Sequence, residues 1–198
     1  MAIVRTGEGT IIGSGFPTAL GACRPRVNCG KTGPMSDAKR NAYSAKVRLP
    51  CAVLGIRTGN GAVTAIEYLP SSERAQAPAD ALAARVADQI ERYLADPHFE
   101  FTLPLAHAGT AFRQRVWAAL AKIPVGESRT YGEIARALHT APRAVGGACG
   151  SNPIALVVPC HRVVGSQGAL GGFMNAAEGD PLAIKRWLLE HEGYRFGA

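Results

Sequence analysis

The sequence of 198 residues has no long hydrophobic run, few charged residues and few cysteines. No apolar stretch approaches the roughly 20 residues of a membrane-spanning helix, and the opening residues lack the basic start and continuous apolar segment of a signal peptide. The 5 cysteines are odd in number and irregularly spaced, which argues against a disulfide framework. With 47% hydrophobic and 19% charged residues, the composition is that of a globular chain. We expect a cytoplasmic protein with reduced thiols and no membrane segment, with one large domain or two small ones.

The formal net charge of +7 is unevenly distributed along the chain. Residues 51–105 carry 4 Lys and Arg against 7 Asp and Glu, whereas residues 1–50 carry 8 against 2 and residues 106–198 carry 10 against 6. Basic surfaces attract phosphate backbones, but many basic proteins bind no nucleic acid. The charge alone is therefore a weak indication of a nucleic-acid partner.

Residues 1–42 are rich in Gly, Ser, Pro and basic residues and show little hydrophobic periodicity. We predict a loosely ordered extension here. Met35, which precedes a polar stretch, is an alternative natural start. Cys23 and Cys29 also lie in this segment, but no pair of histidines accompanies them, so a zinc site is the less favoured interpretation.

Residues 43–105 have the pattern of a small α/β unit. Two β-type runs, 51–58 and 62–70, are joined by Gly59-Asn60-Gly61, which tolerates the positive φ angles of a hairpin turn. A helical stretch lies between two prolines, and residues 99–105 are predicted to form a further strand. Apolar residues recur at helical spacing along that helix: Leu82, Val86, Ile90 and Tyr93.

Residues 106–198 are predicted to be mainly helical, beginning with a helix over residues 111–123. Thr110 is a suitable N-cap for this helix, because its hydroxyl can accept from a free backbone N–H of the first turn. Trp117 in this helix and Trp187 near the C-terminus are expected to be core residues and not base-stacking platforms.

Two short helices with a tight link between them are predicted next. Thr130 and Glu133 form a T-x-x-E capping box at the start of the first, and Pro142, favoured at a first helical position, opens the second. His139 in the link is expected to cap a turn or face solvent. This pattern is typical of a helix-turn-helix.

The second of these helices has an unusual content of small residues, which weaken a helix by up to about 1 kcal/mol for each Gly. Tight packing against a neighbouring element is one interpretation. The other is close approach to a surface such as a nucleic-acid groove, with Arg143 as the one long projecting side chain. The small residues are Ala144, Gly146, Gly147, Ala148 and Gly150.

The stretch VVPCHRVV, residues 157–164, places Cys160 beside His161 between two hydrophobic pairs. For an arbitrary Cys-His pair, the ordinary interpretation is a buried thiol next to a half-exposed ring. A reactive cysteine needs a base, because a free thiol with a pKa of about 8.5 is mostly protonated at neutral pH. Cys149, in the small-residue helix, is expected to be a packing residue.

Taken together, these residues resemble the O6-alkylguanine-DNA alkyltransferases, also called methylated-DNA–protein-cysteine methyltransferases. The matching stretch runs over 109–193 and includes FRQRVWAALAKIPVGESRTYGEIA, RAVGGACGSNPIALVVPCHRVV and WLLEHEG. The pattern N-P-x(5)-P-C-H-R-V is far more specific than a lone Cys-His pair. The resemblance implies an α/β fold, with a ribonuclease-H-like domain over 43–105 and a mainly helical catalytic, DNA-binding domain containing the helix-turn-helix over 106–198.

The activity that the resemblance implies is DNA repair by irreversible transfer of an alkyl group to the protein's own cysteine. Both O6-methylguanine and O4-methylthymine would be flipped out of the duplex to reach this cysteine. Cys160 would be the nucleophile, His161 the base acting through a water, and Glu192 the carboxylate that holds the histidine. Asn152 would be the hinge between the recognition helix and the active-site strand. Neither a cofactor nor a metal in the C-terminal half is implied.

The implied partner is double-stranded DNA containing alkylated bases, bound by a monomer. Tyr131 would donate to N3 of the flipped guanine and crowd the flanking phosphate. Arg143 would fill the vacated stack, which offsets part of the cost of extruding the base. The surface that approaches the groove would consist of Ala144, Gly146 and Gly147.

Two departures from the family pattern concern the surroundings of the site. The link between Tyr131 and Arg143 is about two residues shorter than in better-known members. The usual short loop of the Tyr-Ser-Gly-Gly type is replaced by GGFMNAAEGDPLAIKRW, with Phe173 where Tyr is common and extra residues up to Asp180. We expect the transfer activity to be kept. The range of alkyl groups accepted, and the contacts that the loop makes to the O6 side of guanine, are not fixed by the sequence.

Three other interpretations of the sequence are less favoured. A DNA-binding protein without chemistry is disfavoured, because the alkyltransferase-like relatives carry Trp at the position of Cys160. A cysteine hydrolase using His107 or His191 lacks a recognisable oxyanion hole. A sequence-specific regulator is disfavoured by a recognition helix so poor in base-reading side chains.

Overall fold

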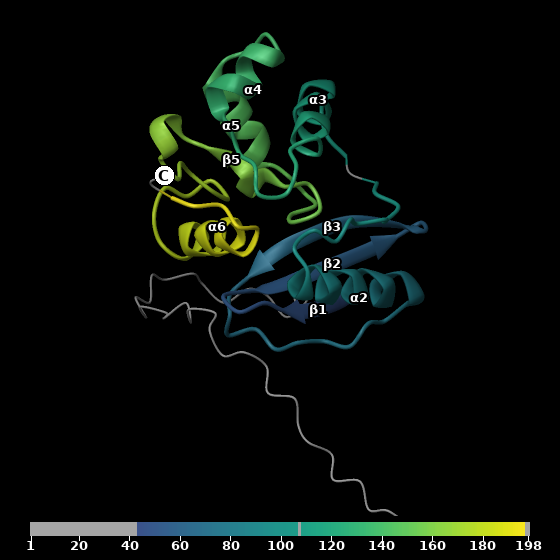
Figure 1. Ribbon diagram of the computed structural model, residues 1–198. Helices are drawn as coiled ribbons and strands as arrows, with labels where there is room; N and C mark the ends of the chain where they lie inside the picture. Colours follow the sequence, from purple (N-terminus) through teal and green to yellow (C-terminus); the bar gives the residue numbers. More distant parts are fainter. Residues whose placement is uncertain (1–42, 107, 197–198) are drawn as a thin grey trace, which may run out of the picture.

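A computed structural model describes residues 43–106 and 108–196 (Figure 1). The predicted extension over 1–42, with the alternative start at Met35 and the cysteines Cys23 and Cys29, lies outside the described residues. The described chain has a mixed α/β fold, as predicted. None of its helices is both long and apolar enough to cross a membrane.

An antiparallel sheet in the order β1-β2-β3 forms the first layer. Its strands are β1 (Ala45–Arg48), β2 (Val53–Gly59) and β3 (Ala62–Leu69). The turn between β2 and β3 has φ angles of 52° at Asn60 and 75° at Gly61, as a two-residue hairpin with both central residues left-handed requires. The predicted hairpin is therefore confirmed, whereas β1 was not predicted.

Helix α2 (Ala81–Ala95) packs against this sheet (Figure 1). The side chain of Asp80 caps it by accepting from the N–H of Ala83 at 2.8 Å. Val86, Ile90 and Tyr93 are buried along the helix, as their spacing predicted.

The strand predicted over 99–105 is wrong. Only Leu105 forms an isolated bridge, with Val63. The backbone N–H of Thr102 donates to the side chain of Gln89 at 2.9 Å, and the amide of Gln89 donates back to the hydroxyl of Thr102 at 3.0 Å. The segment is thus held in its middle by the side chain of Gln89, and only its end is joined to β3, by two backbone hydrogen bonds of Val63 with Pro104 and Ala106.

Helix α3 (Ala111–Leu120) begins at the predicted cap, where the hydroxyl of Thr110 accepts from the N–H of Arg113. It ends three residues before the predicted boundary at 123. The buried Trp117 donates from its ring nitrogen to the carbonyl of Ala148 at 2.9 Å, which ties α3 to α5 (Pro142–Gly150). Trp117 and Trp187 are both buried, as expected.

Helix α4 (Tyr131–Ala137) follows the two-residue strand β4 (Arg129–Thr130) and has the predicted capping box, with both of its hydrogen bonds present. Four residues then lead to α5, which Pro142 opens as predicted. Within this link, His139 is exposed and has a φ of 52°, so it occupies a turn and faces solvent.

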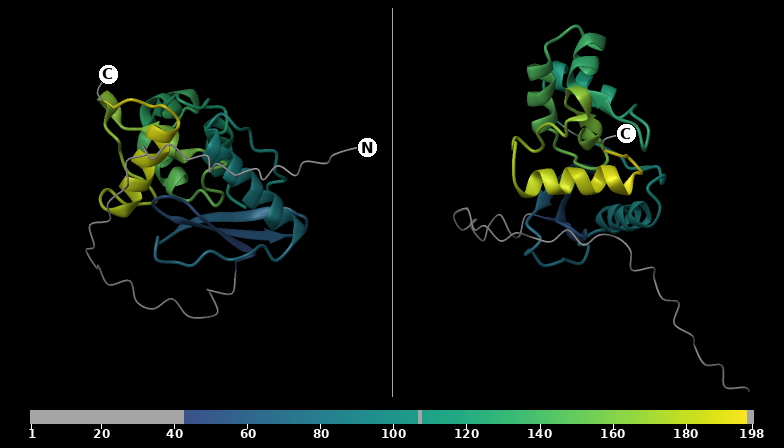
Figure 2. Two further views of the ribbon diagram at one scale, coloured as in Figure 1. Left: turned by 60° about the horizontal axis from the view of Figure 1, so that its bottom comes forward. Right: turned by 60° about the vertical axis from the view of Figure 1, so that its left-hand side comes forward.

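The remaining chain forms short elements before a final helix. The 3-10 helix η1 (Cys160–Arg162) leads into β5 (Val163–Val164), which pairs in parallel with β4. The 3-10 turn η2 (Ser166–Gly168) and a loop precede α6 (Asp180–His191). Figures 1 and 2 show α6 lying between the sheet and helices α4 and α5.

The sheet is joined directly to the segment before η1. Ile66 of β3 donates its backbone N–H to the carbonyl of Pro153 at 2.9 Å, and Ala155 donates to the carbonyl of Ile66 at 3.0 Å. One hydrophobic core cluster extends from β1 through α2 and α3 to α6. The sheet therefore supports the chain segment that carries Cys160.

Candidate functional site

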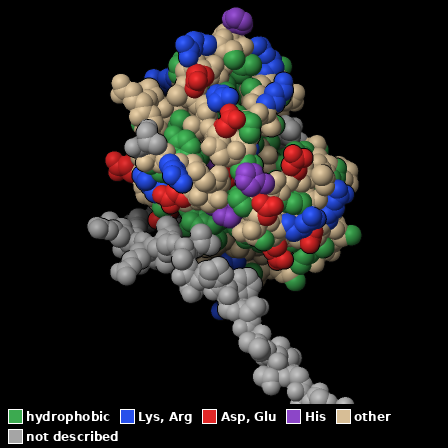
Figure 3. Space-filling model, in the orientation of Figure 1, with side chains coloured by type: hydrophobic (Ala, Val, Ile, Leu, Met, Phe, Trp, Pro, Cys, Tyr) green, Lys and Arg blue, Asp and Glu red, His purple; other side chains and the backbone are tan. Residues whose placement is uncertain are grey.

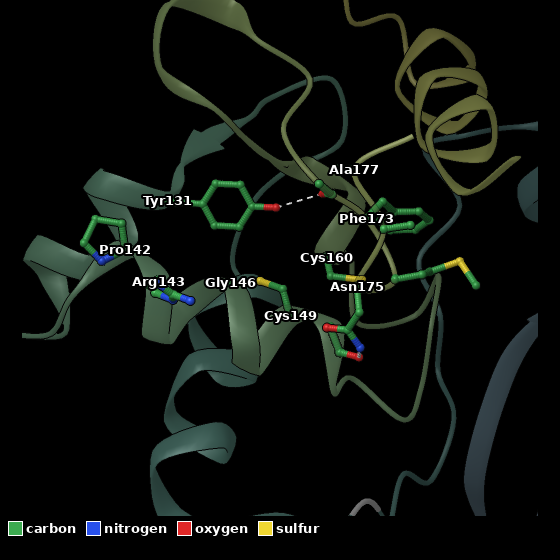
Figure 4. Close-up of a pocket in the computed structure, with 13 residues that line it drawn as sticks. Tyr131, Pro142, Arg143, Gly146, Cys149, Cys160, Phe173, Asn175 and Ala177 are labelled. Carbon is green, nitrogen blue, oxygen red and sulfur yellow. Dashed lines mark hydrogen bonds between the residues drawn. The ribbon is translucent and has the colours of Figure 1, made fainter. Parts of the chain in front are cut away.

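A cavity of about 470 Å³ opens between α4, α5 and the loop that precedes α6 (Figure 4). The sulfur of Cys160 lies at its wall, and only 7% of that residue is exposed. Cys149 lines the same cavity and is buried, so the packing role expected for it accounts for its burial but not for its place at the site. The other lining residues used below are Tyr131, Arg143, Gly146, Gly150, Phe173 and Asn175.

Asn152 fixes the turn that presents Cys160. Its side-chain amide donates to the carbonyl of Val158 at 2.8 Å and to the sulfur of Cys160 at 3.4 Å, while its oxygen accepts from the N–H of Ile154 at 3.1 Å. Leu156, inside this turn, has a φ of 70°, which is costly for a bulky residue. The Asn152 side chain thus provides hydrogen-bond partners for backbone groups of a segment that is neither helix nor strand.

His161 and Glu192 form a buried pair behind the cysteine. Nε2 of His161 lies 2.9 Å from Oε1 of Glu192, and the two residues are 0% and 4% exposed. Arg162 donates to both carboxylate oxygens, from Nε at 2.8 Å to Oε2 and from a terminal nitrogen at 2.8 Å to Oε1. With Nε2 facing a carboxylate, the ring nitrogen Nδ1 is left as the acceptor. Among the described side chains, Nδ1 of His161 is buried and has no hydrogen-bond partner.

The electrostatics favour a neutral thiol and a neutral imidazole at rest. Burial raises the pKa of Cys160, although the hydrogen bond from Asn152 and the charge of Lys185 act in the opposite direction. Burial lowers the pKa of His161 despite the neighbouring Glu192. Burial also opposes the charge of Glu192, but the hydrogen bonds from His161 and Arg162 outweigh it and lower that pKa to about 2. The carboxylate is therefore the one fixed negative charge of this pair.

Lys185 of α6 is a fully buried cation near the cavity. Its ammonium donates to the carbonyls of Val163, Leu170 and Gly172 at 2.6, 2.6 and 3.0 Å. Burial lowers its pKa to about 8, whereas three carbonyl acceptors favour the protonated form. Lys185 thus ties β5 to the loop over the cavity and places positive charge near the thiols.

Tyr131, the first residue of α4, points across the cavity in Figure 4. Its hydroxyl donates to the carbonyl of Gly172 at 2.9 Å. The phenol is half-buried, and burial raises its pKa, so it remains a hydrogen-bond donor at neutral pH. Arg143, the second residue of α5, is exposed at the mouth of the same cavity.

The glycines of α5 separate into two kinds. A side-chain carbon at Gly147 would meet nothing within 4 Å, and one at Gly146 would only touch the ring of Tyr131 at 3.9 Å. One at Gly150 would overlap the amide of Asn175. Internal packing therefore explains Gly150 but not Gly146 or Gly147, which favours the interpretation that their small size serves an external contact.

The loop over the cavity is closed by a tight turn. Phe173 and Ala176 exchange two backbone hydrogen bonds of 2.9 Å across Met174 and Asn175, which have φ angles of 53° and 61°. The side chain of Asn175 donates to the carbonyl of Gly150 at 3.0 Å, which anchors the turn on the end of α5. The extra residues of this loop thus form part of the cavity wall.

Several residues of the site were not identified from the sequence. Tyr93 of α2 donates its hydroxyl to Oε1 of Glu192 at 2.8 Å, although 99 positions separate them. Tyr68 of β3 packs against Phe173 with ring centroids 5.6 Å apart, and its hydroxyl is buried without a partner among the described residues. No periodicity marks such contacts, and Tyr93 had the spacing of an ordinary core residue.

His191, one of the two alternative bases of a cysteine hydrolase, is engaged in other contacts. His191 stacks on Trp187 at 5.1 Å and contacts the carbonyl of Tyr93 through Nε2 at 3.0 Å. His107 lies outside the described residues. Within residues 43–106 and 108–196, no three His, Cys, Asp or Glu side chains are grouped as metal ligands would be.

Basic side chains gather near α3 and α4 on one face of the molecule (Figure 3). On the face shown in Figure 3, Lys and Arg side chains gather at the end of the molecule that holds α3 and α4, while acidic side chains are more numerous over α2. A basic surface at this end suits a phosphate backbone.

Residues 111–194 match the family described as "6-O-methylguanine DNA methyltransferase, DNA binding domain". A methylated-DNA–protein-cysteine methyltransferase of Methanosarcina barkeri is 42% identical over 134 residues, which are 64% of this chain and 82% of that protein. One of Methanosarcina acetivorans is 49% identical over 107 residues, 53% of this chain and 65% of that protein. The chain belongs to this family of methylated-DNA–protein-cysteine methyltransferases. It spans 64–66% of the length of several of its curated relatives.

The fold is also similar to that of solved structures. The crystal structure of Mycobacterium tuberculosis OGT in complex with DNA matches with a TM-score of 0.63 and 40% identity, over 74% of this chain and 90% of that one. The structure of the Mycobacterium tuberculosis O6-methylguanine methyltransferase matches with a TM-score of 0.64 and 36% identity, over 77% of this chain and 94% of that one. The likeness thus covers both the sheet-containing part and the helical part.

Proposed function

We propose that the protein repairs alkylated DNA by moving the alkyl group of O6-methylguanine irreversibly to Cys160. The observation that carries this proposal is a buried thiol at the wall of a cavity, with the His161–Glu192 pair directly behind it. Membership of the family supports O6-methylguanine in DNA as the substrate. The arrangement offers an acceptor in a sheltered pocket and a base that is neutral at neutral pH.

In the proposed step, the proton of the Cys160 thiol moves through a water to Nδ1 of His161. The sulfur then attacks the methyl carbon, a C–S bond forms, and the C–O bond breaks with its electron pair going to guanine O6. The guanine takes up a proton at N1 from water, and the imidazolium of His161 returns its proton to water. Glu192 stabilises the imidazolium that forms in between. None of the described side chains around the cavity is suited to cleave the resulting thioether.

We propose that α4 and α5 act as a helix-turn-helix on duplex DNA. Arg143, exposed at the mouth of the cavity, would enter the stack in place of the extruded base. The surface of Ala144, Gly146 and Gly147 would approach the groove, and the open space at Gly147 supports this role. Tyr131 would leave the carbonyl of Gly172 and donate to N3 of the flipped guanine.

The wider proposal follows the family pattern. The sheet and α2, over residues 43–105, would form a ribonuclease-H-like domain, and residues 106–198 the catalytic domain. The protein would act as a cytoplasmic monomer and accept O4-methylthymine as a second substrate. Asn152 would serve as the hinge between α5 and the cysteine, a role that its three hydrogen bonds support.

Mass spectrometry of the intact protein after incubation with duplex DNA containing O6-methylguanine tests the proposal. We expect a gain of one methyl group, located on Cys160 by peptide mapping. Binding of the same DNA without any gain of mass would instead favour a DNA-binding protein without chemistry. Release of methanol with an unmodified protein would favour a hydrolase.

A further inference from the structure

Oε1 of Glu192 is shared by three hydrogen-bonding groups. The Tyr93 hydroxyl lies at 2.8 Å from it, Nε2 of His161 at 2.9 Å and a terminal nitrogen of Arg162 at 2.8 Å. Oε2 accepts only from Nε of Arg162 among the hydrogen bonds found in the described chain. Tyr93 and His161 therefore compete for the lone pairs of one oxygen.

Tyr93 belongs to α2, far in sequence from the catalytic segment, and is held firmly in place. It is 1% exposed. Its ring meets that of His191 edge-on at 5.2 Å and that of Phe101 at 5.6 Å. Its carbonyl contacts Nε2 of His191 at 3.0 Å. These contacts restrict the Tyr93 side chain to the conformation in which its hydroxyl donates to Glu192.

We propose that Tyr93 is a positioning residue for alkyl transfer, which keeps His161 a neutral base by occupying the carboxylate oxygen that His161 uses. The inference rests on the proposed function, since it concerns the base of that reaction. It assigns to α2, and hence to the sheet-containing part of the chain, a direct share in the chemistry of the site.

The number of donors to Oε1 of Glu192 determines how Tyr93 affects the protonation of His161. A carboxylate oxygen that accepts from several donors is less basic toward each of them. With Tyr93 in place, Glu192 stabilises the imidazolium form of His161 less, and the ring stays neutral more readily. Burial raises the pKa of Tyr93 well above its ordinary value, so the phenol stays protonated and acts as a hydrogen-bond donor.

Other groups that face this pair act alongside Tyr93. Burial has the largest effect on the pKa of His161 and lowers it; Glu192 raises it, and the charges of Arg162 and Lys185 lower it. Cys160 precedes His161 in the chain. Burial raises the pKa of the Tyr68 phenol, and the nearby Cys160 and Glu192 raise it as well. Removal of the Tyr93 hydroxyl leaves all of these in place, so the change at Oε1 can be measured alone.

The test is Tyr93→Phe, with Tyr43→Phe as the matched control. Tyr43 is also buried, and its hydroxyl donates to a carboxylate of the same part of the chain, Glu67, at 2.6 Å. Single-turnover transfer from O6-methylguanine DNA is measured between pH 5 and pH 9. For Tyr93→Phe we expect the acid-side midpoint to rise by about half to one pH unit, with rates about 3- to 10-fold lower below it and nearly equal above it.

A second readout separates this inference from the proposed function. The pKa of His161 is measured directly by NMR of its ring, in the wild type and in both variants. It is expected to rise in Tyr93→Phe and to stay unchanged in Tyr43→Phe. If the wild type transfers no methyl group, the proposed function fails, while the NMR titration still decides the role of Tyr93.

An unchanged pKa of His161, or a rate loss equal at every pH, would show that Tyr93 merely packs the core and would overturn the proposal. If Tyr93→Phe does not fold, 3-fluorotyrosine placed at position 93 decides the matter. Its phenol is a stronger donor, so the pKa of His161 should fall. No downward shift in that protein would equally overturn the proposal.

Discussion

The side-chain amide of Asn152 donates to the sulfur of Cys160 across 3.4 Å, and the same nitrogen donates to the carbonyl of Val158 at 2.8 Å. One side chain therefore shapes the turn before the cysteine and also lowers the pKa of its thiol. Burial is the largest influence on that pKa and raises it, while the charge of Lys185 lowers it alongside Asn152. The balance between burial and these opposing interactions determines how much thiolate is available.

Asn152→Ala is expected to raise the pKa of Cys160 further and to slow transfer at pH 7 by about tenfold, since one pKa unit corresponds to about 1.4 kcal/mol. The rate should approach that of the wild type as the pH is raised. Thiol reactivity and single-turnover rates measured against pH check this. Ser151→Ala, which removes a neighbouring hydroxyl bonded to Gly147 on α5, is the control and should leave the profile unchanged.

Cys160→Ser should abolish transfer but not DNA binding. A hydroxyl has a far higher pKa than a thiol, and the same histidine does not make it nucleophilic. The proposed groove contacts, on Tyr131 and Arg143, stay intact. In the wild type, the amount of repaired DNA should never exceed the amount of protein. Repeated turnover by one molecule, or methyl found on Cys149, would contradict the assignment.

Arg143→Ala should weaken repair of duplex DNA by roughly tenfold or more while leaving transfer from free O6-benzylguanine nearly unchanged. The side chain is exposed at the cavity mouth and is assigned to hold an extruded state, which a free base does not need. Rates on both substrates check this. Equal losses would show that Arg143 supports the pocket itself.

The free energy of unfolding should fall as the pH drops below 6.5, the ordinary pKa of His161. The folded state holds that pKa below its ordinary value, so the unfolded chain binds a proton that the folded chain excludes, at a slope of up to about 1.4 kcal/mol per pH unit. Glu192, with a pKa of about 2, adds its own loss only below about 4.5. Urea unfolding at pH 7.5, 6.5 and 5.5 should show a smaller slope for His161→Gln, and an identical slope would contradict this origin.

Local signals in the sequence were sufficient for elements whose geometry depends on near neighbours. The Asn60-Gly61 turn, the Thr130 capping box and the start of α5 at Pro142 are of this kind, and all three were predicted. The motif around Cys160 likewise indicated the family. Contacts between distant segments left no such signal.

The bond from Tyr93 to Glu192 illustrates why the rest could not be predicted. It arises because Tyr93, near the end of α2, contacts His191 and Glu192 at the end of α6. The apolar spacing that predicted α2 gave Tyr93 only a core role. The segment 99–105 was predicted to be a strand, yet the backbone N–H of Thr102 donates to the side chain of Gln89 and only the end of the segment bonds to β3. In both cases tertiary packing decides which polar groups find partners.

The two glycines of α5 that differ most in their surroundings provide the sharpest test of the DNA-facing surface. Gly147→Ala meets open space, and replacing Gly in a helix gains up to about 1 kcal/mol, so Tm should hold or rise. Repair of duplex DNA should nevertheless fall, because the added methyl would stand where the groove is proposed to approach. Gly150→Ala, the matched control on the same helix, should lower Tm, because its side chain would displace Asn175 and loosen the loop. Repair by Gly147→Ala that equals the wild type would show that this surface does not approach DNA closely.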